Sequence, residues 1–157
     1  MTKRTTGATR RGSSKGRGEG ARGPGKGKGR ARTDRKRNAP PAELASILDA
    51  LLERNARDPV LLDLRDISDA TDWFVIASGD SDTHVRAIAD NVVERAKRHG
   101  VRPAGVEGKG SGTWVLLDFI DIVVHIFLPR VREFYRLEEL WGDAPATPVV
   151  DGAPGTS

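Results

Sequence analysis

Residues 110–141 read GSGTWVLLDFIDIVVHIFLPRVREFYRLEELW, and this stretch decides the fold. It contains two apolar runs, Thr113–Phe119 and Ile122–Leu128, joined by a tight link with an aspartate on each side. β-Branched and aromatic residues dominate both runs, and each run has the length of one strand. The pattern therefore predicts two adjacent antiparallel strands in a buried sheet, followed by a helix over Arg132–Trp141.

The residues upstream of this stretch predict the remaining elements of an α/β domain. Helices are expected after Pro40-Pro41, where leucine and isoleucine recur at helical spacing, and after Gly79–Thr83, where Ser81 or Asp80 is suited to cap a helix. Apolar segments bounded by turn residues predict three further strands, Val60–Asp66, Trp73–Ser78 and Pro103–Glu107. The predicted fold is a single α/β domain of order α-β-β-α-β-β-β-α, with a mixed sheet of about five strands flanked by helices.

Charge is divided sharply along the chain. Residues 1–38 contain fourteen Lys and Arg against two acidic residues, a formal charge of +12. Residues 39–157 contain twelve Lys and Arg against twenty acidic residues, a formal charge of −8. The first segment also has nine glycines and no large apolar residue beyond Met1, so it cannot offset its ordering entropy by burial.

These differences predict three parts. Residues 1–38 are expected to be a disordered basic tail that attracts RNA phosphates, residues 39–142 the folded domain, and residues 143–157 a flexible C-terminal tail. An alternative is that the chain is a general RNA-binding protein acting through its basic tail.

Composition excludes several classes of protein. The chain has no cysteine, so disulfides and thiolate metal sites are ruled out. No apolar run approaches the ~20 residues of a membrane helix, and the first residues have neither the apolar core of a secretory signal nor the aliphatic face of a transit helix. We expect a cytoplasmic protein. The loop Gly108–Gly112 lacks the Lys-Ser/Thr ending of a P-loop, no dinucleotide-binding glycine motif is present, and no cofactor is expected.

An enzymatic alternative rests on Asp80 and Asp82, which follow a predicted strand. A D-x-D pair of this kind can hold Mg²⁺ for nucleotidyl transfer, with Asp118 or Asp121 as a third carboxylate from a neighbouring strand. Capping of the next helix explains the same residues without any metal.

Two further residues could belong to a site. His125 lies inside a strand, and strand alternation places it on the face opposite Val124 and Ile126. No nucleophile accompanies it, which favours a structural or interface role. Trp114 follows a glycine loop at a strand start, where a side chain is half exposed, and tryptophan is a frequent anchor in protein interfaces.

Residues 66–93 (DISDATDWFVIASGDSDTHVRAIADNVV) and 105–141 (GVEGKGSGTWVLLDFIDIVVHIFLPRVREFYRLEELW) closely resemble the Iojap-related ribosomal silencing factor family. The resemblance covers residues 42–142 and consists of many spaced positions rather than one short motif. It implies a nucleotidyltransferase-like fold without demonstrated catalysis. It also implies a protein that is not an enzyme, that uses no cofactor and that is dimeric in isolation.

The resemblance also implies a partner. The family binds the large ribosomal subunit through ribosomal protein L-fourteen and sterically blocks association with the small subunit, which represses translation under nutrient limitation. By matching position and side-chain character, we expect an apolar anchor, four acidic partners and a polar neighbour at the contact: Trp114; Asp72, Glu107, Asp118 and Asp121; and His125. A domain of charge −8 suits basic patches on such a partner, and the tail suits ribosomal RNA.

The chain departs from the family pattern at one point. The family has glycine between the two hairpin strands, where this chain has Phe119-Ile120. Because a β-branched residue does not comfortably adopt a positive φ, we expect a turn of another type here, or one shifted by a residue.

Overall fold

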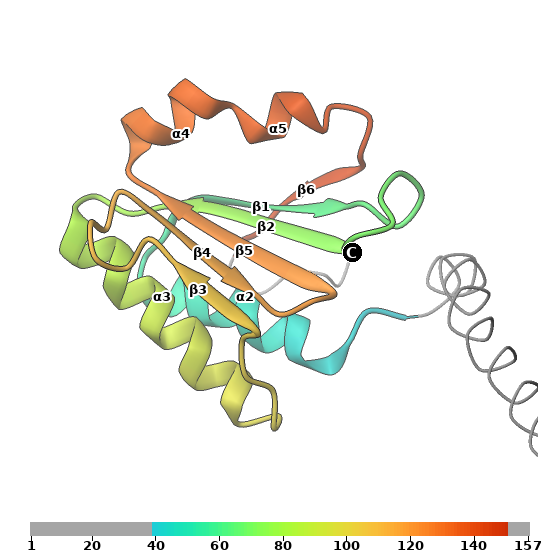
Figure 1. Cartoon of the computed structure of the whole chain (residues 1–157), viewed down its shortest axis with the longest axis horizontal. Coiled ribbons are helices and arrows are strands. Elements are labelled where there is room, and N and C mark those ends of the chain that lie inside the picture. Colours follow the sequence, from blue (N-terminus) through green and yellow to red (C-terminus); the bar gives the residue numbers. More distant parts are fainter. Residues whose placement is uncertain (1–38, 151–157) are drawn as a thin grey trace, which may run out of the picture. The chain divides into compact units, whose positions relative to one another are not determined.

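The structure, a computed structural model, describes residues 39–150 (Figure 1). These residues form six strands, β1 (Arg57–Asp63), β2 (Trp73–Ser78), β3 (Gly105–Glu107), β4 (Trp114–Asp118), β5 (Ile122–Phe127) and β6 (Ala146–Pro148). The strands make one mixed sheet in the order β3-β4-β5-β2-β1-β6. The predicted α/β class and mixed sheet are confirmed, with one strand more than expected.

The centre of the sheet is its one parallel pair, β2 and β5, with Trp73 opposite Ile122 and Ser78 opposite Phe127. Every other neighbouring pair is antiparallel. The predicted hairpin of β4 and β5 is present, with Trp114 opposite Phe127. Strand β5 lies at the middle of the sheet and is buried along nearly its whole length, whereas β4 is buried on one face and only partly buried on the other.

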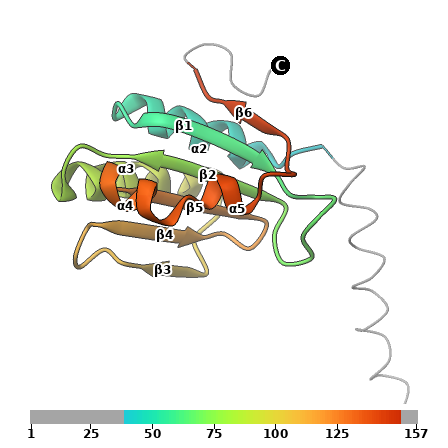
Figure 2. The ribbon, with the colours of Figure 1, turned by 90° about the horizontal axis from the view of Figure 1, so that it is seen from above.

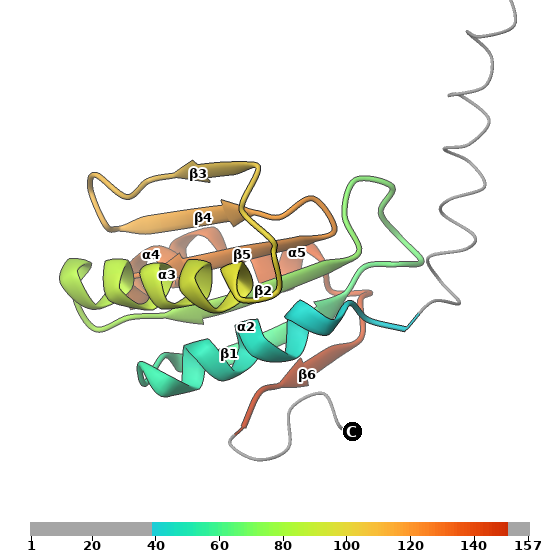
Figure 3. The ribbon, with the colours of Figure 1, turned by 90° about the horizontal axis from the view of Figure 1, so that it is seen from below.

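Helices α2 (Ala42–Glu53) and α3 (Asp82–Lys97) cover one face of the sheet (Figures 1 and 3). Their apolar stripes recur at three- and four-residue spacing and are buried: Leu44, Ile47, Leu48 and Leu51 on α2; Val85, Ile88, Ala89, Val92 and Ala96 on α3. Helix α3 begins at Ser81, whose hydroxyl accepts a hydrogen bond from the N–H of His84, as predicted. The larger core of the domain lies between these helices and the sheet.

Helices α4 (Pro129–Tyr135) and α5 (Leu137–Leu140) lie on the opposite face. Neither helix has a fully buried residue, and the core beneath them is small: Leu62, Leu64, Ile76, Phe127 and Ala144, with partly buried side chains around them. Within the helices, Arg136 has a φ of 46°, a left-handed conformation that separates α4 from α5. The prediction of one continuous helix over Arg132–Trp141 was therefore wrong.

A single arginine fastens this pair of helices to the sheet. The guanidinium of Arg132 donates to the carbonyls of Arg57 and Asp58, at 3.3 and 2.8 Å, and to the hydroxyl of Ser78, at 3.0 Å. It also pairs with Glu138 on α5, at 2.7 Å. The register of β1 against β2 shifts between Arg57 and Val60, so Arg132 satisfies carbonyls that an irregular strand cannot pair within the sheet.

Two predicted boundaries were wrong. Strand β1 begins at Arg57 and ends at Asp63, whereas Val60–Asp66 was expected, because Asp58-Pro59 enters the strand at its irregularity instead of preceding it. Residues 143–150, expected to belong to a flexible tail, include β6, which pairs with β1, and buried Ala144 and Val149. The rest of that tail and the basic tail, residues 151–157 and 1–38, lie outside the described residues.

The turn between β4 and β5 also differs from the expectation. Ile120 does adopt a positive φ, 75°, at the centre of a tight turn closed by the N–H of Asp121 and the carbonyl of Phe119, at 2.9 Å. The carboxylate of Asp118 accepts a further hydrogen bond from the N–H of Ile120, at 2.8 Å. A β-branched residue therefore adopts a positive φ at this position, which the expectation had excluded.

None of the helices in the described part of the chain has the length and apolar character that crossing a bilayer requires.

Candidate functional site

The register of β3, β4 and β5 brings several predicted site residues onto one face of the sheet. Opposed residues in an antiparallel pair share a face, and the pairs include Glu107 with Leu116, Asp118 with Val123, and Leu116 with His125. Figure 2 shows α4 and α5 over the centre of the sheet, with β4 and β3 uncovered beside them. We call the resulting surface the β4 face, made of Glu107, Trp114, Leu116, Asp118 and Val123.

Trp114 stands where the β4 face meets α4. It is half-buried, as predicted, and its ring lies against the rings of Phe127 and Tyr135, with centroids 4.8 and 4.7 Å apart. Its indole N–H donates to Nδ1 of His125, at 3.2 Å. The orientation of the ring is therefore fixed by the fold, which is a condition for an anchor that binds without a large entropic cost.

Helices α4 and α5 add an apolar surface that the sequence analysis missed. Phe134 and Leu140 are 77% and 71% exposed, and Tyr135 is half exposed beside Trp114. Together we call them the α4–α5 patch. Large apolar side chains this exposed on a small domain indicate a contact surface. The aromatic pair Phe134-Tyr135 is the signal in the sequence that could have indicated this surface.

Three acidic members of the predicted site lie at the far end of β4 from Trp114, whereas Glu107 lies opposite Leu116 in the middle of the strand. Asp118 ends β4, and Asp121 follows in the turn, where its carbonyl accepts from the backbone N–H groups of Asp72 and Trp73. The side chain of Asp121 is exposed and that of Asp118 partly so, whereas Asp72 is buried. Asp118 and Asp121 therefore both reach the surface. The buried Asp72 contacts the turn through its backbone N–H, which donates to the carbonyl of Asp121.

His125 lies beneath the β4 face. It is 4% exposed, is packed against Phe74 with ring centroids 4.7 Å apart, and lies on the face predicted by strand alternation. Burial lowers the pKa of His125 to about 4, so the ring is neutral at physiological pH. Its Nδ1 accepts from Trp114, which leaves the proton on Nε2. Within residues 39–150, this Nε2 has no hydrogen-bond partner.

The lowered pKa of His125 predicts a pH dependence of stability. Unfolded histidine titrates near pH 6.5, so the unfolded chain takes up a proton first and stability falls as the pH drops from about 6.5 towards 4. Between pH 7 and pH 5 we expect a loss of about 2 kcal/mol of unfolding free energy. Urea denaturation measures it, and His125→Gln should flatten this part of the curve.

The control for this prediction is His99→Gln, which makes the same substitution at an exposed position, where the ring contacts the hydroxyl of Ser46. It shows the effect of the substitution itself on stability. Carboxylates whose pKa values are lowered, such as Asp63 beside Arg65, change the free energy of unfolding at more acidic pH than the range from pH 7 to pH 5. An unchanged slope in His125→Gln would contradict the assignment.

The loop before Trp114, residues 108–112, is held by contacts with α3. The guanidinium of Arg86 donates to the carbonyls of Lys109 and Gly110, at 2.8 and 3.0 Å, and Lys109 pairs with Asp90. Gly112 lies against Asp82, which a Cβ would approach to 2.8 Å. The loop therefore helps to fix the start of β4.

The proposed catalytic carboxylates do not converge. Asp80 is held by both arms of Arg57, at 3.0 and 3.1 Å, and Asp82 bonds the N–H of Thr83 at the start of α3. Both lie beyond the end of β2 that faces Trp114, whereas Asp118 lies at the other end of β4. No group of three His, Asp or Glu side chains within residues 39–150 is arranged to hold a metal ion. The alternative of an Mg²⁺ site formed by Asp80, Asp82 and Asp118 is therefore contradicted by their placement.

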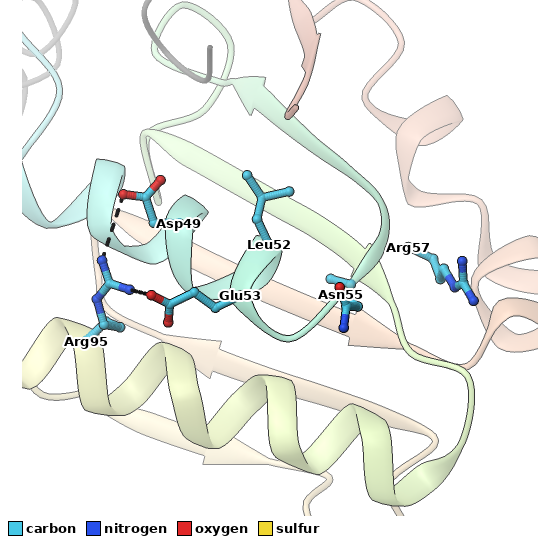
Figure 4. A pocket seen from close by; sticks show the side chains of 7 residues that line it. Asp49, Leu52, Glu53, Asn55, Arg57 and Arg95 are labelled. Carbon is cyan, nitrogen blue, oxygen red and sulfur yellow. Dashed lines mark hydrogen bonds and ion pairs between the residues drawn. The ribbon is translucent and has the colours of Figure 1, made fainter. Parts of the chain in front are cut away.

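The groove beside α2 is lined by charged side chains that pair with one another. Figure 4 shows the groove beside α2, in which Asp49 and Glu53 both pair with Arg95. The amide of Asn91 and the guanidinium of Arg95 bond Glu53 and lower its pKa. These charges already stabilise the packing of α2 on α3, so the groove is explained by the fold.

Comparison of the sequence with known protein families identifies the family of this chain. The sequence profile of the family described as "Ribosomal silencing factor during starvation" matches residues 37–156. The chain belongs to this family. The resemblance inferred from the residues is thereby confirmed, and the family name describes a factor that silences ribosomes.

Individual members of the silencing-factor family and related proteins are similar along the folded domain. The ribosomal silencing factor RsfS of Bacillus subtilis is 42% identical over 93 residues, 59% of this chain and 79% of that protein. Mitochondrial assembly of ribosomal large subunit protein 1 of Mus musculus is 34% identical over 102 residues, 63% of this chain and 45% of that protein. A crystal structure from Chromobacterium violaceum has a TM-score of 0.63 at 36% identity, over 73% of this chain and 96% of that one.

Proposed function

We propose that this protein silences ribosomes by binding the large subunit at ribosomal protein L-fourteen and sterically blocking association with the small subunit, which lowers translation when nutrients are limiting. The protein acts as a binding factor in the cytoplasm and not as an enzyme. The observation that carries the proposal is the β4 face, a rigid surface with a fixed tryptophan at one end and carboxylates at the other.

The chemistry of this surface suits a basic ribosomal protein. Trp114 and the neighbouring α4–α5 patch supply apolar area at the centre of a contact, where such side chains contribute most of the binding energy. Glu107, Asp118 and Asp121 supply negative charge at its rim, where charge steers association and fixes register. Asp72 and His125 are buried, so they support the surface and do not contact the partner directly. His125 orients Trp114 by accepting the hydrogen bond of its indole N–H.

Sedimentation of mixed subunits tests the function. Purified full-length protein added to large subunits before small subunits should reduce the fraction of joined ribosomes, and the effect should disappear when the subunits are joined beforehand. Joining that proceeds unchanged at saturating protein would exclude this function.

Replacement of the surface residues tests the site. We expect Trp114→Ala to weaken binding to large subunits by about a hundredfold, because it removes a central aromatic anchor. Asp118→Lys should weaken it by about tenfold, mainly through a slower association rate. Asp118→Asn separates charge from structure, since an amide oxygen can still accept from the N–H of Ile120. Equilibrium binding to purified subunits measures all three.

The matched control is Glu94→Lys, which makes the same charge change on α3, on the opposite face of the sheet. It should leave affinity unchanged. Thermal denaturation of each variant shows whether the domain is folded, because Trp114 also contacts the smaller core. Undiminished binding by both Trp114→Ala and Asp118→Lys would exclude the site.

Two further parts of the proposal concern the basic tail and the oligomer. A segment of charge +12 attracts ribosomal RNA beside the docked domain, and such contacts make binding depend on salt. The salt dependence of binding should therefore be steeper for the full chain than for a chain that lacks residues 1–38. Dimers of the free protein, which the resemblance implies, would appear in light scattering and dissociate on the ribosome.

A further inference from the structure

The turn between β4 and β5 contains a residue that is strained. Ile120 has a φ of 75° and lies at the centre of a turn in which the N–H of Asp121 bonds the carbonyl of Phe119. This is the rare, strained form of the three-residue turn. β-Branched residues are the least suited to a positive φ, and glycine the best suited.

The domain does not use the Ile120 side chain. It is 59% exposed, whereas Phe119 before it and Ile122 after it are buried in the larger core. The turn itself is closed by backbone groups and by the carboxylate of Asp118, none of which needs a side chain at position 120. Packing therefore gives no compensation for the strain.

The position of Ile120 on the surface offers a compensation for this strain. Ile120 lies in the turn between Asp118, which ends β4, and the exposed Asp121, so its exposed side chain is flanked in the chain by two acidic residues. Strained backbone conformations persist where a function needs them. An exposed branched apolar side chain between two acids suits a protein surface with an apolar spot among basic residues, and does not suit an RNA backbone, which the acids would repel.

We infer that Ile120 is a contact residue for the basic ribosomal-protein partner, held in a strained turn so that its side chain projects from the acidic end of the surface. The inference rests on the proposed function. It adds a second apolar contact, remote from Trp114, and makes this turn a determinant of affinity particular to this chain.

The test is a set of substitutions whose effects on stability and binding have opposite signs. Ile120→Gly removes both the strain and the side chain, so it should raise the Tm by about 4 °C while weakening binding to large subunits about tenfold. Ile120→Asn, which also tolerates a positive φ, should behave the same way. Ile120→Val keeps the branched side chain and should change neither quantity.

Scanning calorimetry and equilibrium binding of the full chain to purified large subunits provide both measurements. A purely structural residue would not lose binding while gaining stability. The inference is overturned if Ile120→Gly binds as tightly as the unmodified chain while Trp114→Ala binds weakly, or if Ile120→Gly lowers the Tm. If Trp114→Ala and Asp118→Lys also bind normally, the proposed docking site itself has failed.

Discussion

Replacing Gly108 with alanine should destabilise the domain by about 4 kcal/mol, because a side chain has no space at this position. A Cβ added to Gly108 would lie 1.9 Å from the carbonyl oxygen of Trp114 and 3.0 Å from its carbonyl carbon. Both atoms belong to the backbone of β4 and cannot move without breaking the sheet. The φ of Gly108, 87°, adds strain for any other residue. The midpoint of urea denaturation at constant slope measures the loss.

Two other glycines separate the causes of this effect. Gly110→Ala lies in the same loop with nothing within 4 Å of the new Cβ, and should change stability by less than about 0.5 kcal/mol. Gly100→Ala meets no atoms either but has a φ of 76°, so its cost should be the backbone strain alone, about 1 kcal/mol. Equal effects at Gly108 and Gly100 would mean that the contact with Trp114 is relieved at little cost.

Removing the Arg132 side chain should cost about 3 kcal/mol, because four partners lose their donor at once. Arg132 is only 12% exposed, and its guanidinium bonds two carbonyls of β1, the hydroxyl of Ser78 and the carboxylate of Glu138. The small core beneath α4 and α5 does not hold these helices strongly by itself. We expect Arg132→Ala to release them, with faster amide exchange in residues 129–141 than in β2 and β5.

Two variants make this prediction specific. Arg132→Lys keeps the charge but cannot bridge the same acceptors, so it should recover less than half of the lost stability. Arg136→Ala removes an exposed arginine whose pair with Glu139, at 3.4 Å, should contribute little. Uniformly faster exchange across the whole sheet in Arg132→Ala would contradict the idea that this residue fastens one pair of helices.

The elements that sequence predicted well are those whose burial follows a simple period. Alternation in β5 correctly separated His125 from Val124 and Ile126, and the helical spacing of leucine and isoleucine correctly predicted the buried stripe of α2. Strand β6 was missed because it has three exposed residues, one of them Pro148, and its pairing with β1 depends on a partner far away in the sequence. The break at Arg136 was missed because nothing local marks a left-handed arginine.

The candidate site was predicted only in part, because sequence shows spacing within one strand but not contacts between distant elements. Trp114 and Asp118 share a face because they are four residues apart in one strand, which sequence can show. The exposure of Phe134 and Tyr135 depends on how α4 lies over the sheet, which sequence cannot show. The burial of Asp72 depends on the turn that follows β4, more than forty residues away in the chain.

The parallel pairing of β2 and β5 also has a consequence for the time at which this protein becomes active during its own synthesis. Chains are made from the N-terminus at roughly 5–20 residues per second, and β2 cannot gain its central partner until Phe127 has left the ribosome. The outer edge of β1 stays open until Pro148 has followed. A nascent chain therefore has no complete central sheet until β5 has emerged, and under the proposed function it cannot dock through the β4 face before then.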